Sequence, residues 1–157
     1  MAKQKGFSLI ELLIVVTVIL IIAAIAIPSL MRSKMRANEA DAVASLRVLH
    51  TAAVTYSTAY PDLGYPPSLA SMGGANPCTA SSTQACLIDG TLSTGAKSGY
   101  AFAWTGDGLV PSFSFTSTAT PQSVGVSGQN MFCSDQTGVI RYDTTGTNCT
   151  ATSSVLN

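Results

Sequence analysis

Residues 5–31 read KGFSLIELLIVVTVILIIAAIAIPSLM, and this stretch decides how the rest of the chain is organised. No charged residue stands between Leu12 and Met31, where Leu, Ile, Val and Ala dominate. A helix of about 20 such residues is long enough to cross a lipid bilayer. The whole chain has 157 residues, which leaves room for one modest domain outside this segment.

The apolar stretch differs from an ordinary secretory signal peptide. Such a signal uses an apolar region of roughly 7–15 residues before a small-x-small cleavage site, and Ala24-Ile25-Ala26 would supply that site. The apolar block is longer here, and Glu11 lies inside it. We therefore expect the segment to remain as a membrane helix. The alternative is cleavage after Ala26, which would release a secreted, disulfide-containing binding protein.

Glu11 is the most informative residue of the segment. A carboxylate in hydrocarbon costs about 2.5–3.5 kcal/mol even on the lenient insertion scale, so it is normally placed there for a partner. A cut between Gly6 and Phe7 would create a free amine one helical turn away. The alternative is that Glu11 lies in the membrane interface and reaches water from there.

Residues 5–16 resemble the class III prepilin signal of type IV pilins and type II secretion pseudopilins. The resemblance covers about the first thirty residues. It implies that a prepilin peptidase cuts after Gly6, so that residues 1–6 form a cleaved leader. It also implies that Phe7 becomes the N-methylated mature N-terminus and that Glu11 pairs with the Phe7 amine during assembly.

The helical pattern continues beyond the membrane segment. Residues 29–59 contain no glycine or proline, and their apolar residues recur at three- and four-residue spacings. We expect residues 7–59 to form one helix of roughly 80 Å at 1.5 Å per residue, with residues 7–31 in the membrane or filament core and residues 32–59 amphipathic. Pro28, which prepilin helices often carry, would be a soft point because it lacks the N–H that bonds to the carbonyl of Ala24.

The apolar positions of this outer half include small and large side chains. They are Ala40, Val43, Ala44, Leu46, Val48, Leu49, Ala52, Ala53 and Tyr56. The polar residues between them can be solvated or pair locally; they are Glu39, Asp41, Arg47 and His50. Such a stripe needs a sheet to lie on, because an isolated helix cannot bury it.

Residues 60–157 have the pattern of a globular head. Tyr60-Pro61 ends the helix, and residues 61–97 are rich in Gly, Pro, Ser, Thr and Ala without a period, which predicts a loop. Alternating apolar and polar residues then predict strands at 100–104, 113–116, 130–132 and 139–142, with a turn at 135–138. The expected fold is therefore α+β, a pilin fold in which the long helix packs on a three- or four-stranded antiparallel sheet.

All four cysteines lie in the C-terminal half: Cys78, Cys86, Cys133 and Cys149. They form no C-x-x-C pair and the chain has one histidine, so disulfides are favoured over zinc. Sequential pairing, Cys78–Cys86 and Cys133–Cys149, is the most economical of three connectivities. A Cys133–Cys149 bond resembles the C-terminal disulfide-bounded loop of type IVa pilins.

Metal binding is not expected from the ligand types present. Major pseudopilins tend to carry a calcium-binding loop near the C-terminus, and Asp135 and Asp143 are the only weak candidates for one. Neighbouring carboxylates are too few to predict a site.

Composition and motifs favour assembly over chemistry. The net charge is zero, with no basic surplus that would indicate a nucleic-acid partner. No catalytic constellation or cofactor motif is evident, so neither enzymatic activity nor a cofactor is expected. We predict a structural subunit of a type IV pilus, a homo-oligomeric helical filament serving attachment, motility or DNA uptake. The alternative is a pseudopilin of a type II secretion system, acting in a periplasmic pseudopilus.

The resemblance also implies partners and a location. They are a prepilin peptidase, a cytoplasmic assembly ATPase and an inner-membrane platform protein. The precursor would reside in the inner membrane and the mature subunit in an extracellular pilus.

Overall fold

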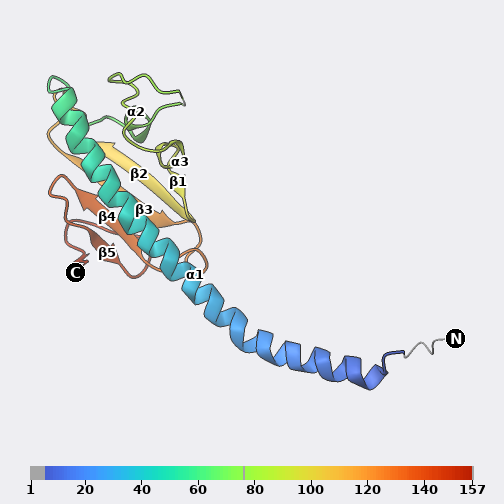
Figure 1. Ribbon diagram of the computed structural model, residues 1–157. Helices are drawn as coiled ribbons and strands as arrows, with labels where there is room; N and C mark the ends of the chain where they lie inside the picture. Colours follow the sequence, from blue (N-terminus) through green and yellow to red (C-terminus); the bar gives the residue numbers. More distant parts are fainter. Residues whose placement is uncertain (1–5, 76, 157) are drawn as a thin grey trace. The chain divides into compact units, whose positions relative to one another are not determined.

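A computed structural model describes residues 6–75 and 77–156 of the chain (Figure 1). Residues 1–5 of the expected leader lie outside the described residues. The contacts divide the chain into two compact units, Met1–Lys34 and Met35–Asn157. Helix α1, Leu9–Ala59, has 51 residues and belongs to both.

Helix α1 begins and ends close to the expected residues. It starts at Leu9, two residues after the expected start, since Phe7 and Ser8 are not part of the helix. It ends at Ala59, directly before Tyr60-Pro61. Pro28 lies inside the helix, which continues through it without a break in assignment.

Within the Met35–Asn157 unit, α1 buries one face. Its buried residues recur every three or four positions: Glu39, Ala42, Ser45, Leu46, Leu49, Ala52, Ala53 and Tyr56. The expected stripe was wrong at Ala40, Ala44 and Val48, which are exposed. Alanine and valine occur on both sides of this helix, so spacing alone did not separate the buried arc from its opposite.

The sheet has six strands in the order β1-β2-β3-β4-β5-β6, and every neighbouring pair is antiparallel. The strands are β1 Ala96–Lys97, β2 Tyr100–Gly106, β3 Phe115–Pro121, β4 Met131–Asp135, β5 Arg141–Asp143 and β6 Ser154–Val155. Figure 1 shows α1 lying across this sheet. The three or four expected strands correspond to β2–β5. The edge strands β1 and β6 have two residues each, too few to show a period.

Aromatic side chains fill the space between α1 and the sheet. Tyr100 and Phe102 of β2 and Phe132 of β4 are buried on the same side as Phe115 of β3. Trp104 stacks on Phe115 with ring centroids 4.2 Å apart. These aromatic side chains therefore pack in the core of the head.

The expected strand at residues 113–116 begins two residues later, at Phe115. The side chain of Phe113 is 70% exposed, whereas that of Phe115 is 2% exposed. The alternating pattern predicted that both side chains lie on one face of a strand, but only Phe115 belongs to β3. Phe113 belongs instead to the loop between β2 and β3.

The segment expected to be an irregular loop, residues 61–97, contributes to the core. It contains two one-turn helices, α2 Leu69–Met72 and α3 Gly90–Ser93, which bury Leu69, Met72 and Leu92. Ser68 forms a capping box with Ser71 at the start of α2. Asp89 caps α3 by accepting the Leu92 N–H at 2.8 Å, and this hydrogen bond lowers the pKa of Asp89. Elements this short carry no helical period, which is why the sequence did not predict them.

The orientation of α1 on the sheet can be tested by measuring the stability of two variants. Leu46 has no exposed surface, so Leu46→Ala would lower the free energy of unfolding by about 2–5 kcal/mol through lost burial and a residual cavity. Urea unfolding in detergent, followed by the fluorescence of the single Trp104, would measure it. Val48→Ala, on the exposed face of the same helix, is the matched control and would change stability by less than about 0.5 kcal/mol. Equal losses in the two variants would contradict this orientation of α1.

Candidate assembly site

The start of α1 places Glu11 against the backbone that precedes the helix. The Glu11 Oε2 atom accepts the Ser8 N–H at 3.0 Å. Glu11 is the third residue of the helix and Ser8 precedes the first, so this is one half of a capping box. The carboxylate is therefore turned toward the Phe7–Ser8 backbone and away from the following turn.

Gly6 has no structural reason to be glycine. A Cβ atom placed on it would meet nothing within 4 Å, and its φ angle lies outside the left-handed range. Phe7, which follows it, is 86% exposed. Neither packing nor backbone geometry in the described residues explains this pair.

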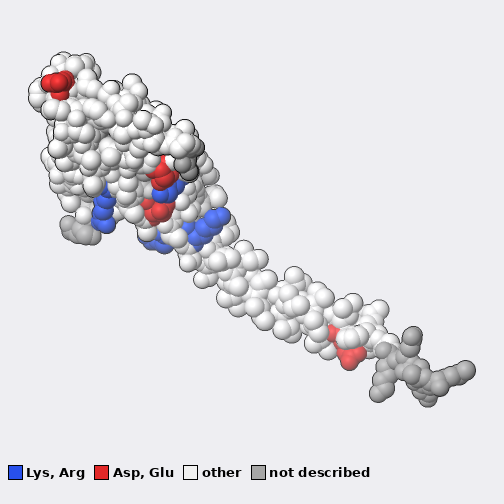
Figure 2. Space-filling model, turned by 45° about the horizontal axis from the view of Figure 1, so that its top comes forward, with Lys and Arg blue, Asp and Glu red and all other residues white. Residues whose placement is uncertain are grey.

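The apolar segment of α1 is uncovered. Its large side chains from Leu9 to Met31 are exposed, and α1 is long and apolar enough to cross a membrane by length and composition. Figure 2 shows no charged atoms on the visible face of this stretch, between the red atoms near its N-terminal end and the first blue atoms. Thr17 donates its hydroxyl to the carbonyls of Leu13 and Ile14, so it adds no unpaired polar group.

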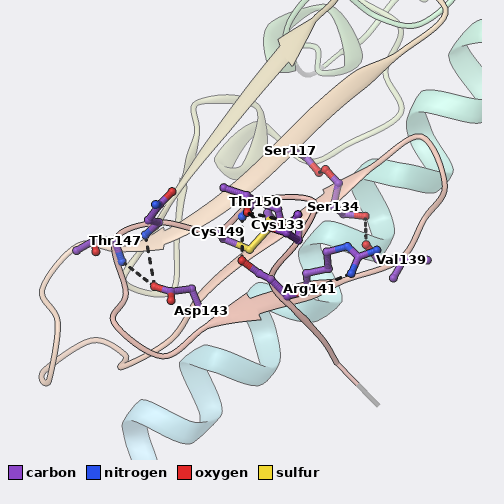
Figure 3. Close-up of a disulfide and its surroundings, with 12 residues drawn as sticks. Ser117, Cys133, Ser134, Val139, Arg141, Asp143, Thr147, Cys149 and Thr150 are labelled. Carbon is purple, nitrogen blue, oxygen red and sulfur yellow. Dashed lines mark hydrogen bonds between the residues drawn. A yellow bond between two sulfur atoms is a disulfide. The ribbon is translucent and has the colours of Figure 1, made fainter.

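The head carries two disulfides among its described residues. Cys78–Cys86 closes a small ring in the segment between α1 and the sheet. Cys133–Cys149 ties β4 to the C-terminal tail, and Figure 3 shows the tail lying beside the strand at this bond. Arg141 of β5 donates to the Ser153 carbonyl at 3.1 Å and so holds the same tail.

The two calcium candidates do not come together. In the β4–β5 register Asp143 pairs with Met131, whereas Asp135 lies four residues farther along β4, about 13 Å away at ~3.3 Å per residue. Asp135 accepts hydrogen bonds from Thr137, and Asp143 accepts one from the Thr145 hydroxyl that lowers the pKa of Asp143. Among the described residues, no three His, Cys, Asp or Glu side chains gather as metal ligands would.

Residues 1–27 match the family described as the prokaryotic N-terminal methylation motif. This chain has a prepilin-type N-terminus. The match includes Glu11 and the pair Gly6 and Phe7, for which the described residues provide no packing role.

Curated relatives of this chain include both pilins and a secretion protein. The chain is 46% identical over 50 residues to the type IV major pilin protein PilA of Myxococcus xanthus, covering 32% of this chain and 23% of that protein. It is 51% identical over 53 residues to a fimbrial protein of Pseudomonas aeruginosa, covering 34% of each. It is 35% identical over 54 residues to the type II secretion system core protein G of Escherichia coli, covering 34% of this chain and 37% of that protein.

The aligned part covers 32–34% of this chain and between 23% and 37% of the length of these relatives. No solved structure matches the chain significantly.

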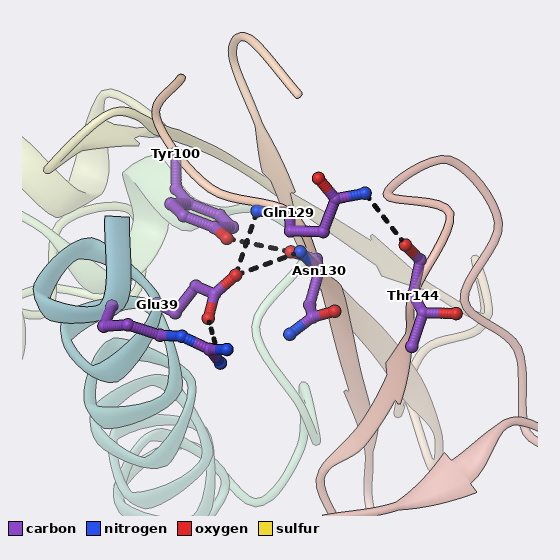
Figure 4. A network of polar contacts seen from close by, with 6 residues as sticks. Glu39, Tyr100, Gln129, Asn130 and Thr144 are labelled. Atoms are coloured by element: carbon purple, nitrogen blue, oxygen red, sulfur yellow. Dashed lines mark hydrogen bonds and ion pairs between the residues drawn. The ribbon is translucent and has the colours of Figure 1, made fainter. Parts of the chain in front are cut away.

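The head contains a polar contact at Glu39 that extends beyond the local pairing expected from the sequence. Glu39 was expected to be solvated or locally paired, but it is 7% exposed. Its Oε1 atom accepts the N–H of Gln129 at 2.9 Å and that of Asn130 at 3.2 Å, directly before β4 (Figure 4). Arg36 approaches the other oxygen at 3.5 Å, but its side chain is 81% exposed and adds little.

Tyr100 completes this contact from the opposite side. Its hydroxyl donates to the Asn130 carbonyl at 2.8 Å, so the backbone of one residue is held at both its N–H and its carbonyl. Burial of the ring, and next the nearby charge of Glu39, raises the pKa of Tyr100. The helical spacing could have identified Glu39, because it lies three residues before Ala42 and therefore on the buried face of α1.

The Glu39 contact predicts a graded loss of stability. Glu39→Ala would lower the free energy of unfolding by about 2–3 kcal/mol, because two backbone N–H groups lose a charged acceptor. Glu39→Gln would lose less, since its amide oxygen can still accept. Asp62→Ala, which removes an exposed carboxylate, serves as the control. Equal losses for Ala and Gln in urea unfolding would show that the acceptor oxygen is unimportant.

Proposed function

We propose that this chain is the structural subunit of a type IV pilus, made as an inner-membrane precursor and assembled into a filament. The observation that carries the proposal is a prepilin-type N-terminus on a helix whose apolar side chains have no cover. Such a segment needs lipid before assembly and neighbouring copies of itself afterwards. The filament is then a homo-oligomer with a core of α1 segments and a surface of heads.

Processing follows from the same residues. A prepilin peptidase cuts after Gly6, and Phe7 becomes the methylated N-terminus. The lack of any packing role for Gly6 supports its being there for the peptidase. An assembly ATPase and a membrane platform protein supply the energy and the scaffold for insertion.

Glu11 pairs with the amine that cleavage creates. In the precursor its carboxylate is already held at the Ser8 N–H, 3.0 Å away and one residue from the future amine. A subunit docked out of register would leave both charges unpaired in an apolar interior, which is costly. The pair therefore favours insertion in register. Pro28 acts as a soft point that lets α1 adjust to its neighbours.

The second candidate function is that of a type II secretion pseudopilin, a subunit of a periplasmic pseudopilus. The similarity to core protein G favours it. The Cys133–Cys149 bond closing the tail supports the pilus, because it matches the disulfide-bounded loop of pilins. Long surface fibres containing this chain would support the pilus. A secretion defect on deletion, without such fibres, would support the pseudopilus.

Mass spectrometry of the mature chain tests the processing step. We expect a product that begins at Phe7 and carries one added methyl group. A Gly6→Ala precursor made beside it would accumulate uncut if the peptidase requires glycine. A mature product beginning at Ile27 would instead support the secreted binding protein and overturn the filament proposal.

A Glu11 variant tests the charge pair. Glu11→Ala would be processed normally but would give few filaments, because the Phe7 amine lacks its partner. Thr17→Ala, a polar residue of the same apolar segment, is the matched control and would assemble. Electron microscopy of sheared fibres measures the outcome. Glu11→Ala fibres as abundant as those of the unchanged chain would refute the pairing.

A further inference from the structure

The loop between β2 and β3 exposes a cluster of large apolar side chains. In this tip loop, residues 107–114, Leu109 is 61% exposed, Val110 76% and Phe113 70%. Single exposed apolar residues are common, but three within one short loop indicate an interaction surface. The loop lies near the end of α1, since Tyr56, Leu63, Leu109 and Val110 line one depression of about 400 Å³.

Hydrogen bonds hold the tip loop in one conformation. The Asp107 carboxylate accepts the N–H groups of Leu109 at 3.0 Å, Phe113 at 2.8 Å and Ser114 at 3.0 Å. The first two of these bonds do most to lower the pKa of Asp107, so the carboxylate stays ionised well below the ordinary aspartate range. The exposed side chains are thus presented by an ordered loop, which reduces the entropy lost on docking.

A second anchor joins the tip loop to the segment after α1. The Ser112 N–H donates to the Leu63 carbonyl at 2.8 Å, and the Tyr65 N–H donates to the Ser112 carbonyl at 3.0 Å. Gly64 is required between them, because its φ is +73° and a Cβ atom there would lie 2.1 Å from the Ser112 oxygen. Leu63 and the tip loop therefore form one rigid surface.

The exposed face of α1 is a second uncovered surface in the same unit. It carries small and apolar side chains with one charge: Ala40, Ala44, Arg47, Val48, Thr51, Val54 and Thr55. A shallow groove of about 300 Å³ runs along it, lined by Arg47, Val48, Thr51, Ala52, Thr55 and Leu87. Among the described residues Arg47 makes no ion pair, and nor does Asp62 beside the tip loop.

We propose that the tip loop of one copy docks into the α1 groove of the next copy in the filament. The two surfaces are unlike each other: the loop presents exposed apolar side chains, and the groove is a shallow depression with apolar walls at Val48 and Leu87. A contact between unlike surfaces of the same chain can repeat from copy to copy, and it generates an open filament when its rotation does not close a ring. The inference rests on the proposed filament function and adds the contact between heads.

Charge and position support a second copy as the occupant. Among the described residues of its unit Arg47 has no ion-pair partner, and Asp62 next to Leu63 offers one of opposite sign on the tip side. The groove lies on α1 before the end that the tip loop adjoins. Each docking event would therefore displace the next copy along α1 of the head.

Photo-cross-linking tests the contact in assembled filaments. A benzophenone amino acid at position 110 of the full chain is expected to give dimers of this chain, with the adduct at Val48, Thr51 or Leu87. The same probe at Ala103, exposed on the opposite face of the sheet, is the control and would not label these residues. Filaments in which position 110 labels lipid, another protein or a different part of this chain would overturn the docking proposal.

A charge exchange tests the same contact without a bulky probe. Arg47→Glu and Asp62→Arg would each lower the filament yield by up to about fivefold, the upper end for an exposed charge pair, and the double variant would restore most of it. A double variant no better than either single variant would overturn the pairing. Circular dichroism of each variant identifies any that fails to fold. Val110→Ser, at a site that is 76% exposed, then tests the tip loop in its place and is expected to lower the filament yield.

Failure of the docking proposal is distinguishable from failure of the function. If the unchanged chain forms filaments but the cross-link and the exchange fail, only the docking contact is wrong. If the unchanged, processed chain never enters a filament, the proposed function itself is wrong.

Discussion

The apolar face of α1 has to be removed from water, and most of the structure follows from that constraint. If the apolar side chains of this 51-residue helix were all exposed, they would form a patch far larger than soluble proteins carry. In the Met35–Asn157 unit the sheet covers part of it, with Leu46 and Leu49 fully buried. From Leu9 to Met31 the large apolar side chains stay exposed among the described residues. Folding therefore leaves one segment whose burial must come from lipid or from other copies.

Polar contacts give the helix its position on the sheet. Apolar packing is non-directional, whereas a hydrogen bond requires two atoms to meet at a defined distance and angle. Glu39 adds such a contact, because its carboxylate accepts the N–H groups of Gln129 and Asn130. Tyr100 holds Asn130 from the β2 side. A buried carboxylate thus joins α1 to the backbone directly before β4.

The head is tied together by short, separate devices. The disulfides, the Asp107 hydrogen bonds and the one-turn helices each order a segment that has too little apolar surface to order itself. The rigid loops also keep exposed apolar side chains in defined places, which is what a repeating contact requires.

Local patterns were enough to predict the prepilin-type N-terminus, α1 and the central strands. These patterns are a charge in an apolar run, a helical period, and alternation around Tyr100 and Phe102. The sequence also predicted the sequential pairing of the four cysteines, which the structure contains. Three outcomes needed the folded structure: which arc of α1 is buried, that Phe113 is exposed and Phe115 is not, and that Glu39 lies in the core. These outcomes depend on contacts between residues far apart in the chain, such as Glu39 with Gln129, and no local pattern encodes such a meeting. The physical reason is that a side chain is buried only where two parts of the chain pack together, whereas a sequence pattern describes only one of those parts.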